Sequence, residues 1–185
     1  YYLQEGSPCI DTGHTFYGPD PDGTIADIGA LYHHQQGGLI VGALSGTIGP
    51  GEYTVLGDLS IVNGATLTIE PGTTFLFDGP FDFEITSNRT LIAQGTESDS
   101  IKFMPNFDNG VTYWDHVEIS NSGDDDILEY CLITGGATPG YGGGINCYYS
   151  SPTISNCTIS GNTAQLGGGI YCYYYSSPQI TGCTI

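Results

Sequence analysis

Positively charged side chains are almost absent from this sequence. Only Arg89 and Lys102 are basic, against 20 Asp and Glu among 185 residues, so the formal net charge is −18. Such a surface repels the phosphates of nucleic acids and of anionic membranes, which excludes both as electrostatic partners. It also repels itself, and divalent cations or high salt relieve that repulsion. We therefore expect no nucleic-acid partner. We also expect that the protein binds calcium or works in a saline environment.

Long apolar runs are also absent. The longest covers only residues 39–44, whereas a membrane-spanning helix needs roughly 18 apolar residues, so no membrane insertion is expected. Hydrophobic residues make up 39% of the chain and charged residues only 12%, which is not the composition of a disordered chain. No leader-like segment precedes Tyr1, so either a leader has been removed or the chain is a piece of a longer protein. We expect an extracellular or cell-surface location.

The last third of the sequence repeats itself. Residues 150–159 return as residues 176–185 at a shift of 26, and Gly142–Ile145 returns as Gly167–Ile170 at a shift of 25. A unit of this length, rich in Gly, Pro and β-branched residues, suits one coil of three short strands separated by turns. Stacked coils place equivalent side chains about 4.8 Å apart, so each inward position becomes a column.

Four columns of apolar side chains follow from this repeat. They are Leu128/Ile154/Ile180, Cys131/Cys157/Cys183, Ile133/Ile159/Ile185 and Ile119/Ile145/Ile170. Short segments of alternating character, separated by turn signals, also occupy residues 53–103, and no window favours an amphipathic helix. The sequence therefore predicts an all-β parallel β-helix of three-strand coils, each about 25–26 residues long, with almost no helix.

Two groups of motifs resemble a known family. The run from Gly57 to Thr73, followed by Gly95-Thr96 and Ile101-Lys102-Phe103, resembles the first coils of secreted bacterial right-handed β-helix proteins. The Gly-Gly-Gly-Ile and Ile-Ser-Asn-Cys-Thr-Ile-Ser-Gly-Asn coils are similar to repeats of that family and of polymorphic outer-membrane proteins. The resemblance implies a right-handed parallel β-helix over residues 46–185, with irregular first coils over 46–110 and regular repeats over 111–185. It implies little about function, because this solenoid serves lyases, hydrolases, adhesins and passive stalks.

The two ends of the chain suggest an assembly. Residues 1–34 resemble the segment that usually closes such a solenoid, residues 35–45 are predicted to be a linker, and the chain stops in mid-coil at Ile185. Two interpretations stay open. The chain is a fragment cut between two solenoid modules, or residues 1–34 self-associate with the open 176–185 end of a neighbouring copy and build a head-to-tail filament.

One acidic turn offers a candidate calcium site. Asp20, Asp22, Thr24 and Asp27 supply oxygen ligands around Gly23 in a pattern partly like that of a calcium-binding loop. The bidentate Glu of an EF-hand is missing, and an acidic turn in which Asp side chains cap backbone amides is the alternative. Calcium is therefore the one cofactor that the sequence suggests.

The cysteines favour packed thiols over disulfides. Cys131, Cys157 and Cys183 share one predicted column, and Cys147 and Cys172 share another. Parallel side-chain vectors in a column fit the torsion of a disulfide poorly, whereas stacked thiols pack as small apolar groups. Metal binding is the least favoured alternative, because no paired C-x-x-C spacing occurs.

Tyrosine is the residue in surplus, with 14 copies. Tyr148, Tyr149, Tyr173, Tyr174 and Tyr175 are predicted to gather at one corner of successive coils. Exposed aromatic surfaces pack against another protein or bind glycans, and both interpretations stay open beside a ladder that only covers its own turns. We expect this corner to be the interaction surface.

No catalytic constellation stands out in the sequence. None of the four His adjoins a Ser or Cys motif, and Asp124-Asp125-Asp126, although similar to the paired carboxylates of solenoid glycosidases, is typical of a solvated turn. Polysaccharide lyases of this fold need basic residues to abstract a proton or to neutralise charge, and the sequence has only two basic residues. The sequence therefore favours a non-catalytic extracellular structural β-solenoid, acting as a surface stalk, an adhesin or a head-to-tail filament subunit. The alternative is a carbohydrate-binding or carbohydrate-degrading β-helix.

Overall fold

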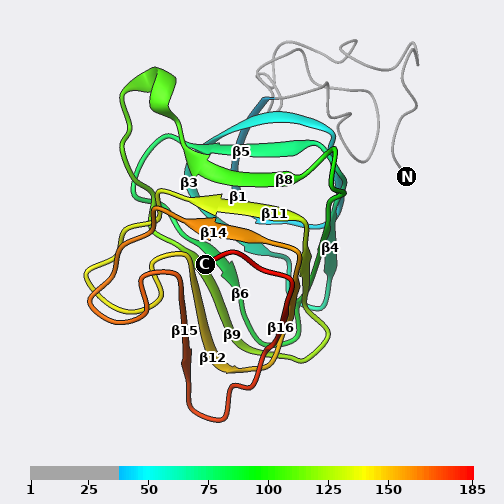
Figure 1. The fold of residues 1–185 in the computed structure, drawn as a ribbon. Coiled ribbons are helices and arrows are strands. Elements are labelled where there is room, and N and C mark those ends of the chain that lie inside the picture. The colour runs from blue at the N-terminus through cyan, green and yellow to red at the C-terminus, as the bar shows by residue number, and fades with distance from the viewer. Residues whose placement is uncertain (1–37) are drawn as a thin grey trace.

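A computed structural model describes residues 38–185 and shows a parallel β-solenoid of stacked coils (Figure 1). Every strand pairing in this part of the chain is parallel, and the only helical element is a single 3-10 turn, η2 (Phe107–Asn109). The predicted all-β parallel β-helix is confirmed. Among the described residues, no helix is long and apolar enough to cross a membrane.

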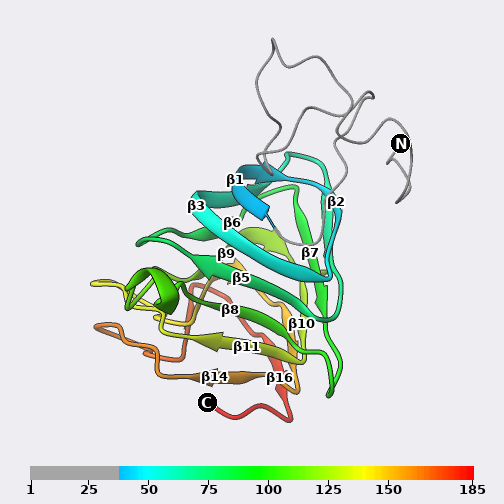
Figure 2. The same ribbon diagram turned by 90° about the horizontal axis from the view of Figure 1, so that it is seen from above.

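The strands form three faces, each built from one strand per coil. The first face, in spatial order, contains β14 (Thr158–Ser160), β11 (Cys131–Thr134), β8 (Ile101–Pro105), β5 (Thr73–Phe77) and β3 (Gly51–Ile61). The second continues from β3 through β6 (Phe83–Ile85), β9 (Val117–Gly123), β12 (Ile145–Ser150) and β15 (Ile170–Tyr173). The third contains β16 (Gln179–Thr181), β13 (Thr153–Ser155), β10 (Ile127–Glu129), β7 (Thr90–Gln94), β4 (Thr66–Ile69) and β2 (Gly46–Ile48). Figure 2 shows the first face from the side, coil upon coil.

Alternating side chains fill the interior, as expected for a strand with one buried face. In the first coils the inward positions are aromatic and stack along the axis. The ring of Phe75 lies 5.9 Å from Tyr53 and 5.3 Å from Phe103, and Phe77 lies 4.2 Å from Trp114. All five side chains are buried, and each stacked pair adds about 0.5–1.5 kcal/mol beyond the burial of its apolar area.

Three of the predicted columns lie where the repeat places them. Leu128 lies opposite Ile154, which lies opposite Ile180. In the isoleucine column, Ile133 pairs with Ile159, and in the cysteine column the N–H of Cys131 lies 3.4 Å from Sγ of Cys157. The bridge between Thr158 and Thr184 places Cys183 and Ile185 in the next coil of these two columns. Ile185 is 63% exposed, whereas Ile133 and Ile159 are buried.

The fourth predicted column is right for Ile145 and Ile170 and wrong by two residues for Ile119. Ile145 lies opposite Val117, not Ile119, and Ile119 lies opposite Cys147. The segment from Ser120 to Ile127 is two residues longer than the paired segment from Tyr148 to Thr153, so the 26-residue shift that holds from β10 onward points to the wrong partner in β9. Because side chains alternate along a strand, a shift of two keeps both isoleucines inside the core.

The linker predicted over 35–45 is also wrong for the described part of that range. Residues 38–44 form β1 (Gly38–Leu44), which pairs with β3, and Ile40 and Leu44 are buried in the core. Its glycines look like a flexible connection in the sequence. Gly42 instead turns the strand at a corner, with a φ of 82° where the register shifts. The described solenoid therefore includes residues before 46.

Candidate functional site

A cluster of tyrosines forms one corner of the last two coils. We call it the tyrosine face; it consists of Tyr141, Tyr148, Tyr149, Tyr171, Tyr173, Tyr174 and Tyr175. The rings form pairs across coils, with centroid distances of 4.8 Å for Tyr141–Tyr171, 5.9 Å for Tyr148–Tyr173 and 5.4 Å for Tyr149–Tyr174. The structure thus brings together all five tyrosines expected at this corner, and Tyr141 and Tyr171 lie beside them.

The tyrosine face is open to solvent. Tyr141 and Tyr149 lie in a coil that has neighbouring coils on both sides, yet they are 47% and 42% exposed. In the following coil Tyr173 and Tyr174 are also exposed. Large aromatic rings that remain exposed next to one another form the kind of surface that binds a partner.

Three of these tyrosines adopt a backbone conformation that bulky residues avoid. Tyr149, Tyr174 and Tyr175 have φ angles of 48°, 41° and 55°, in the left-handed region that costs an L-residue about 1–2 kcal/mol. At the corresponding turn of the preceding coil stands Asn121, a residue that tolerates this region more easily. Strain of this kind is typical of positions where the side chain serves a function.

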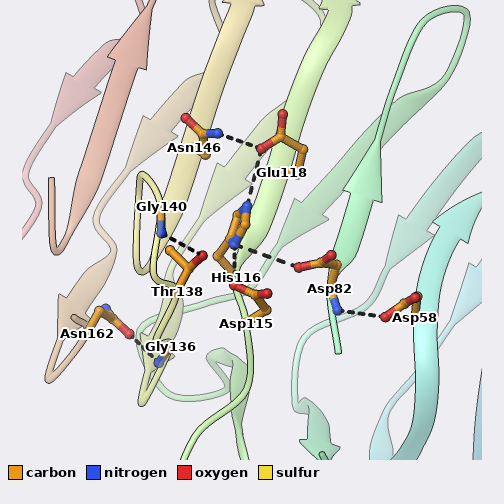
Figure 3. Close-up of polar contacts among 10 residues, drawn as sticks. All are labelled: Asp58, Asp82, Asp115, His116, Glu118, Gly136, Thr138, Gly140, Asn146 and Asn162. Carbon is orange, nitrogen blue, oxygen red and sulfur yellow. Dashed lines mark hydrogen bonds and ion pairs between the residues drawn. The ribbon is translucent and has the colours of Figure 1, made fainter. Parts of the chain in front are cut away.

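A histidine held by carboxylates lies on the second face. Figure 3 shows His116 between Asp115, Asp82 and Glu118. The Nδ1 atom lies 2.8 Å from Oδ1 of Asp115 and 3.7 Å from Oδ1 of Asp82, and Nε2 lies 3.2 Å from Oε2 of Glu118. Asp82 directly precedes β6, and Asp115 and His116 directly precede β9. Because Phe83 pairs with Val117, the two strands bring Asp82 and His116 into neighbouring coils. We call these four residues the histidine–carboxylate cluster.

Polar side chains on either side of this cluster form hydrogen bonds with it. The Nδ2 group of Asn146 donates a 2.7 Å hydrogen bond to Oε2 of Glu118, and the N–H of Asp82 donates to Oδ1 of Asp58 at 3.2 Å (Figure 3). Asn146 lies opposite Tyr171 in the next coil. The histidine–carboxylate cluster and the tyrosine face are therefore continuous along the second face.

The environment shifts the pKa values of the cluster. Burial alone lowers the pKa of His116, but hydrogen bonds to Glu118 and Asp115 and the charges of Asp115 and Asp82 outweigh it and raise the pKa to about 9. Burial raises the pKa of Asp82 to about 6, with a further contribution from the charge of Asp115. Without a bound metal ion, His116 therefore carries a proton on both nitrogens at neutral pH.

Sequence reasoning missed this cluster. Asp82 and His116 belong to irregular coils with a long loop between them, so no repeat aligns them. The available signal was that each precedes an apolar residue at the start of a strand, Phe83 or Val117. That signal becomes useful only when the two strands are known to pair.

The acidic run at 124–126 divides into two environments. Asp124 and Asp125 are exposed, as expected for a solvated turn, but Asp126 is buried, and the expectation is wrong for it. Its Oδ1 accepts a 2.7 Å hydrogen bond from the N–H of Leu91, and its Oδ2 accepts one from the hydroxyl of Ser122. Burial raises the pKa of Asp126, while these hydrogen bonds oppose the shift. This carboxylate connects two coils and does not face solvent.

The cysteines of the described residues are all free thiols. Cys131, Cys147 and Cys157 are buried, and Cys172 is exposed. A hydrogen bond from the thiol of Cys147 lowers the pKa of Cys172 to about 7, although partial burial opposes this effect. Cys172 is therefore the reactive thiol of this part of the chain.

The predicted calcium site lies outside the described residues. Asp20, Asp22, Thr24 and Asp27 all precede residue 38, as does the whole closing segment 1–34. Calcium binding and head-to-tail docking therefore stay predictions.

Comparison with known proteins identifies the type of solenoid. Residues 106–185 match the family model described as a right-handed beta helix region. Neither the curated proteins nor the solved structures yield a match. The narrower resemblance to secreted bacterial and outer-membrane proteins stays a prediction. The parallel register of the coils shows a β-solenoid, and the family match over residues 106–185 supports the right-handed β-helix type for that part of the chain.

Proposed function

We propose that the chain is a non-catalytic structural solenoid of the cell exterior, a surface stalk or adhesin, and that the tyrosine face attaches it to its partner. One observation carries this proposal. Tyr149, Tyr174 and Tyr175 hold exposed rings on strained backbone at the same turn of successive coils. A turn that only had to reverse the chain would be more stable with Asn or Gly there.

The rest of the solenoid suits a rigid support for such a surface. Hydrogen-bonded strands join each coil to its neighbours on three faces, and the core is continuous from Ile40 to Ile159. A surface on stacked coils repeats along the axis, so several weak contacts form at once and strengthen one another. Each tyrosine ring can contribute about 150–250 Å² of contact area.

Charge limits the partner. With a formal net charge of −18, the chain repels acidic polymers and anionic surfaces. Neutral or basic surfaces are therefore the partners that the tyrosine face suits.

Carbohydrate binding is the second candidate function. The observation in its favour is that Asn146, and through it Glu118, adjoins Tyr171 on the second face. Amide and carboxylate groups beside an aromatic ring are suited to sugar hydroxyls and to the apolar face of a sugar ring. The stacked tyrosines weaken this candidate, because the rings of Tyr149 and Tyr174, 5.4 Å apart, cover one another's inner faces.

An attachment assay with the full chain tests the proposal. Beads coated with the protein are applied to cellulose, to chitin and to a polylysine layer, and the retained fraction is measured after washing. The variant changes Tyr149, Tyr174 and Tyr175 to Asn, which the solenoid already uses at Asn121 and Asn156 in the same backbone conformation. The control is Tyr113→Asn, which removes a ring outside the tyrosine face that is about as exposed as those of Tyr149 and Tyr174.

The outcomes separate the candidates. A structural adhesin retains beads on at least one surface, loses most of that retention in the triple variant and keeps it in the Tyr113→Asn control. Retention on the two polysaccharides alone favours the carbohydrate-binding candidate. Release of reducing sugars from either polysaccharide would show an enzyme and overturn the non-catalytic assignment.

The filament version of this function needs residues 1–34. Their predicted docking on residues 176–185 of a neighbouring copy would produce long rods in electron micrographs of the full chain, and deletion of residues 1–34 would leave short ones. Dispersed short rods from the intact chain would contradict it.

A further inference from the structure

The histidine–carboxylate cluster contains three metal-binding atoms that point toward one another. Nδ1 of His116 and one carboxylate oxygen each from Asp82 and Asp115 all lie within 4.8 Å of one another. Zinc forms bonds of about 2.0–2.2 Å to such atoms, which puts neighbouring ligands of a tetrahedral ion about 3.3 Å apart. The distances from Nδ1 to Asp115 and Asp82, 2.8 Å and 3.7 Å, lie on either side of that value.

The far side of the histidine ring is arranged as in a metal-binding histidine. Nε2 faces Oε2 of Glu118 at 3.2 Å, and Asn146 holds the same oxygen with a 2.7 Å hydrogen bond. When a metal ion displaces the proton on Nδ1, the proton on Nε2 stays donated to Glu118 and the lone pair of Nδ1 faces the ion between the two aspartates. Metal-binding histidines commonly use a carboxylate in this way to fix the ring and its tautomer.

One atom of the cluster lacks a hydrogen bond. Oδ1 of Asp82 is buried and has no hydrogen-bond donor, although it is the oxygen that faces Nδ1 of His116. Buried polar atoms are rarely left in this state, and an ion is one of the partners that such an atom takes. The missing hydrogen bond to this oxygen is an observation separate from the clustering of the three side chains.

We propose that Asp82, Asp115 and His116 bind a divalent transition-metal ion of the zinc type, with Glu118 and Asn146 holding the histidine ring. One imidazole nitrogen and two carboxylate oxygens favour zinc over calcium, which takes six to eight oxygen ligands. The three side chains are only partly buried, so water completes the coordination. The surrounding negative charge draws the cation in.

The ion would join two neighbouring coils. Asp82 precedes β6, and Asp115 and His116 precede β9, so a shared ion adds a link beside the strand pairing of these two elements. A metal that binds only the folded chain raises its stability in proportion to the logarithm of the metal concentration. This role is independent of the tyrosine face and does not rest on the proposed function.

The test uses the full chain, stripped with a chelator and titrated with zinc chloride by calorimetry at pH 7.5. The variants are Asp82→Asn and His116→Gln. The control is Asp58→Asn, which removes the same single negative charge beside the cluster and keeps an oxygen to accept the N–H of Asp82. We expect one ion per chain, at least tenfold weaker binding in both variants and less than threefold weaker binding in the control.

X-ray absorption at the zinc edge identifies the ligands. Nitrogen and oxygen scattering with an imidazole contribution supports the site, whereas sulfur scattering would place the zinc on the cysteines and overturn it. Zinc should raise the melting temperature of the wild type but not that of His116→Gln. Asp115→Asn is a second variant if Asp82→Asn fails to fold. Undiminished binding in the variants, or no binding at all, would show that a proton alone occupies the cluster.

Discussion

The backbone N–H of Leu91 donates a 2.7 Å hydrogen bond to the carboxylate of Asp126, 35 residues further along the chain. The bond joins the start of β7 to the turn before β10 in the next coil. The second oxygen of the same carboxylate accepts from the hydroxyl of Ser122, so both sides of a fully buried acid have a partner. A solenoid with little positive charge thus uses backbone and hydroxyl donors to hold a carboxylate inside.

Asp126→Ala should destabilise the chain more than Asp126→Asn. Alanine leaves the N–H of Leu91 buried without an acceptor, which costs about 1–3 kcal/mol, whereas asparagine keeps an oxygen for Leu91 and offers its amide to Ser122. Urea denaturation of the two variants measures the difference. Equal free energies of unfolding would show that the hydrogen bond to Leu91 contributes nothing.

The same carboxylate predicts a pH dependence. Because burial raises the pKa of Asp126 in the folded state, its contribution to stability is complete below the unfolded pKa of about 3.9 and is lost as the pH rises through the folded value. The free energy of unfolding of the wild type minus that of Asp126→Asn should therefore fall as the pH rises from about 4, and then become constant. A difference that rises with pH would contradict the shift.

Asn162 should be a second point of weakness. Its Oδ1 accepts a 2.8 Å hydrogen bond from the N–H of Gly136, and its Nδ2 donates to the carbonyl of Ile133 at 3.0 Å. Asn162→Ala removes both bonds and should cost about 1–3 kcal/mol of stability. Asn162→Asp keeps only the acceptor, so its melting temperature should lie between those of the wild type and of Asn162→Ala. An Asn162→Ala variant as stable as the wild type would rule out this role.

Tyr175→Asn should leave the stability unchanged or raise it by up to about 1 kcal/mol, because asparagine relieves the left-handed backbone at little loss of packing. Tyr171→Asn should instead lower it by about 1 kcal/mol, because the ring of Tyr171 stacks on Tyr141 at 4.8 Å. Differential scanning calorimetry compares the two. The reverse order would mean that the strained tyrosines are needed for folding.

Cys172 should react faster with iodoacetamide at neutral pH than an ordinary thiol. The thiol of Cys147 donates to it and lowers its pKa to about 7, so Cys147→Ala should move the half-maximal rate toward the usual value of about 8.5. Peptide mapping by mass spectrometry separates Cys172 from the buried Cys131 and Cys157, which should stay unmodified in the folded chain. An unchanged rate profile in Cys147→Ala would contradict the donor role of Cys147.

Short-range repetition explains what the sequence could predict. Ile154 and Ile180 stand in nearly identical peptides, so their column follows from alignment alone, and the tyrosine corner follows from the same register. Ile119 was misplaced because hydrogen-bonded strands keep their register while the segments between them change length from coil to coil, in this case the segment after Ser120. The site at His116 escaped for the same reason, and the burial of Asp126 escaped because its partner is a backbone amide, which no side-chain pattern reports.

The most direct test of the proposed attachment role is a pair of values for one variant, in which Tyr149, Tyr174 and Tyr175 are all changed to Asn. Its free energy of unfolding and its retained fraction on the surface that holds the wild type are measured together. The proposal predicts a free energy within about 1 kcal/mol of the wild type, because ring stacking and backbone strain offset one another. It also predicts at least a tenfold drop in the retained fraction. A stable variant that attaches as well as the wild type would contradict the claim that these tyrosines form the binding surface.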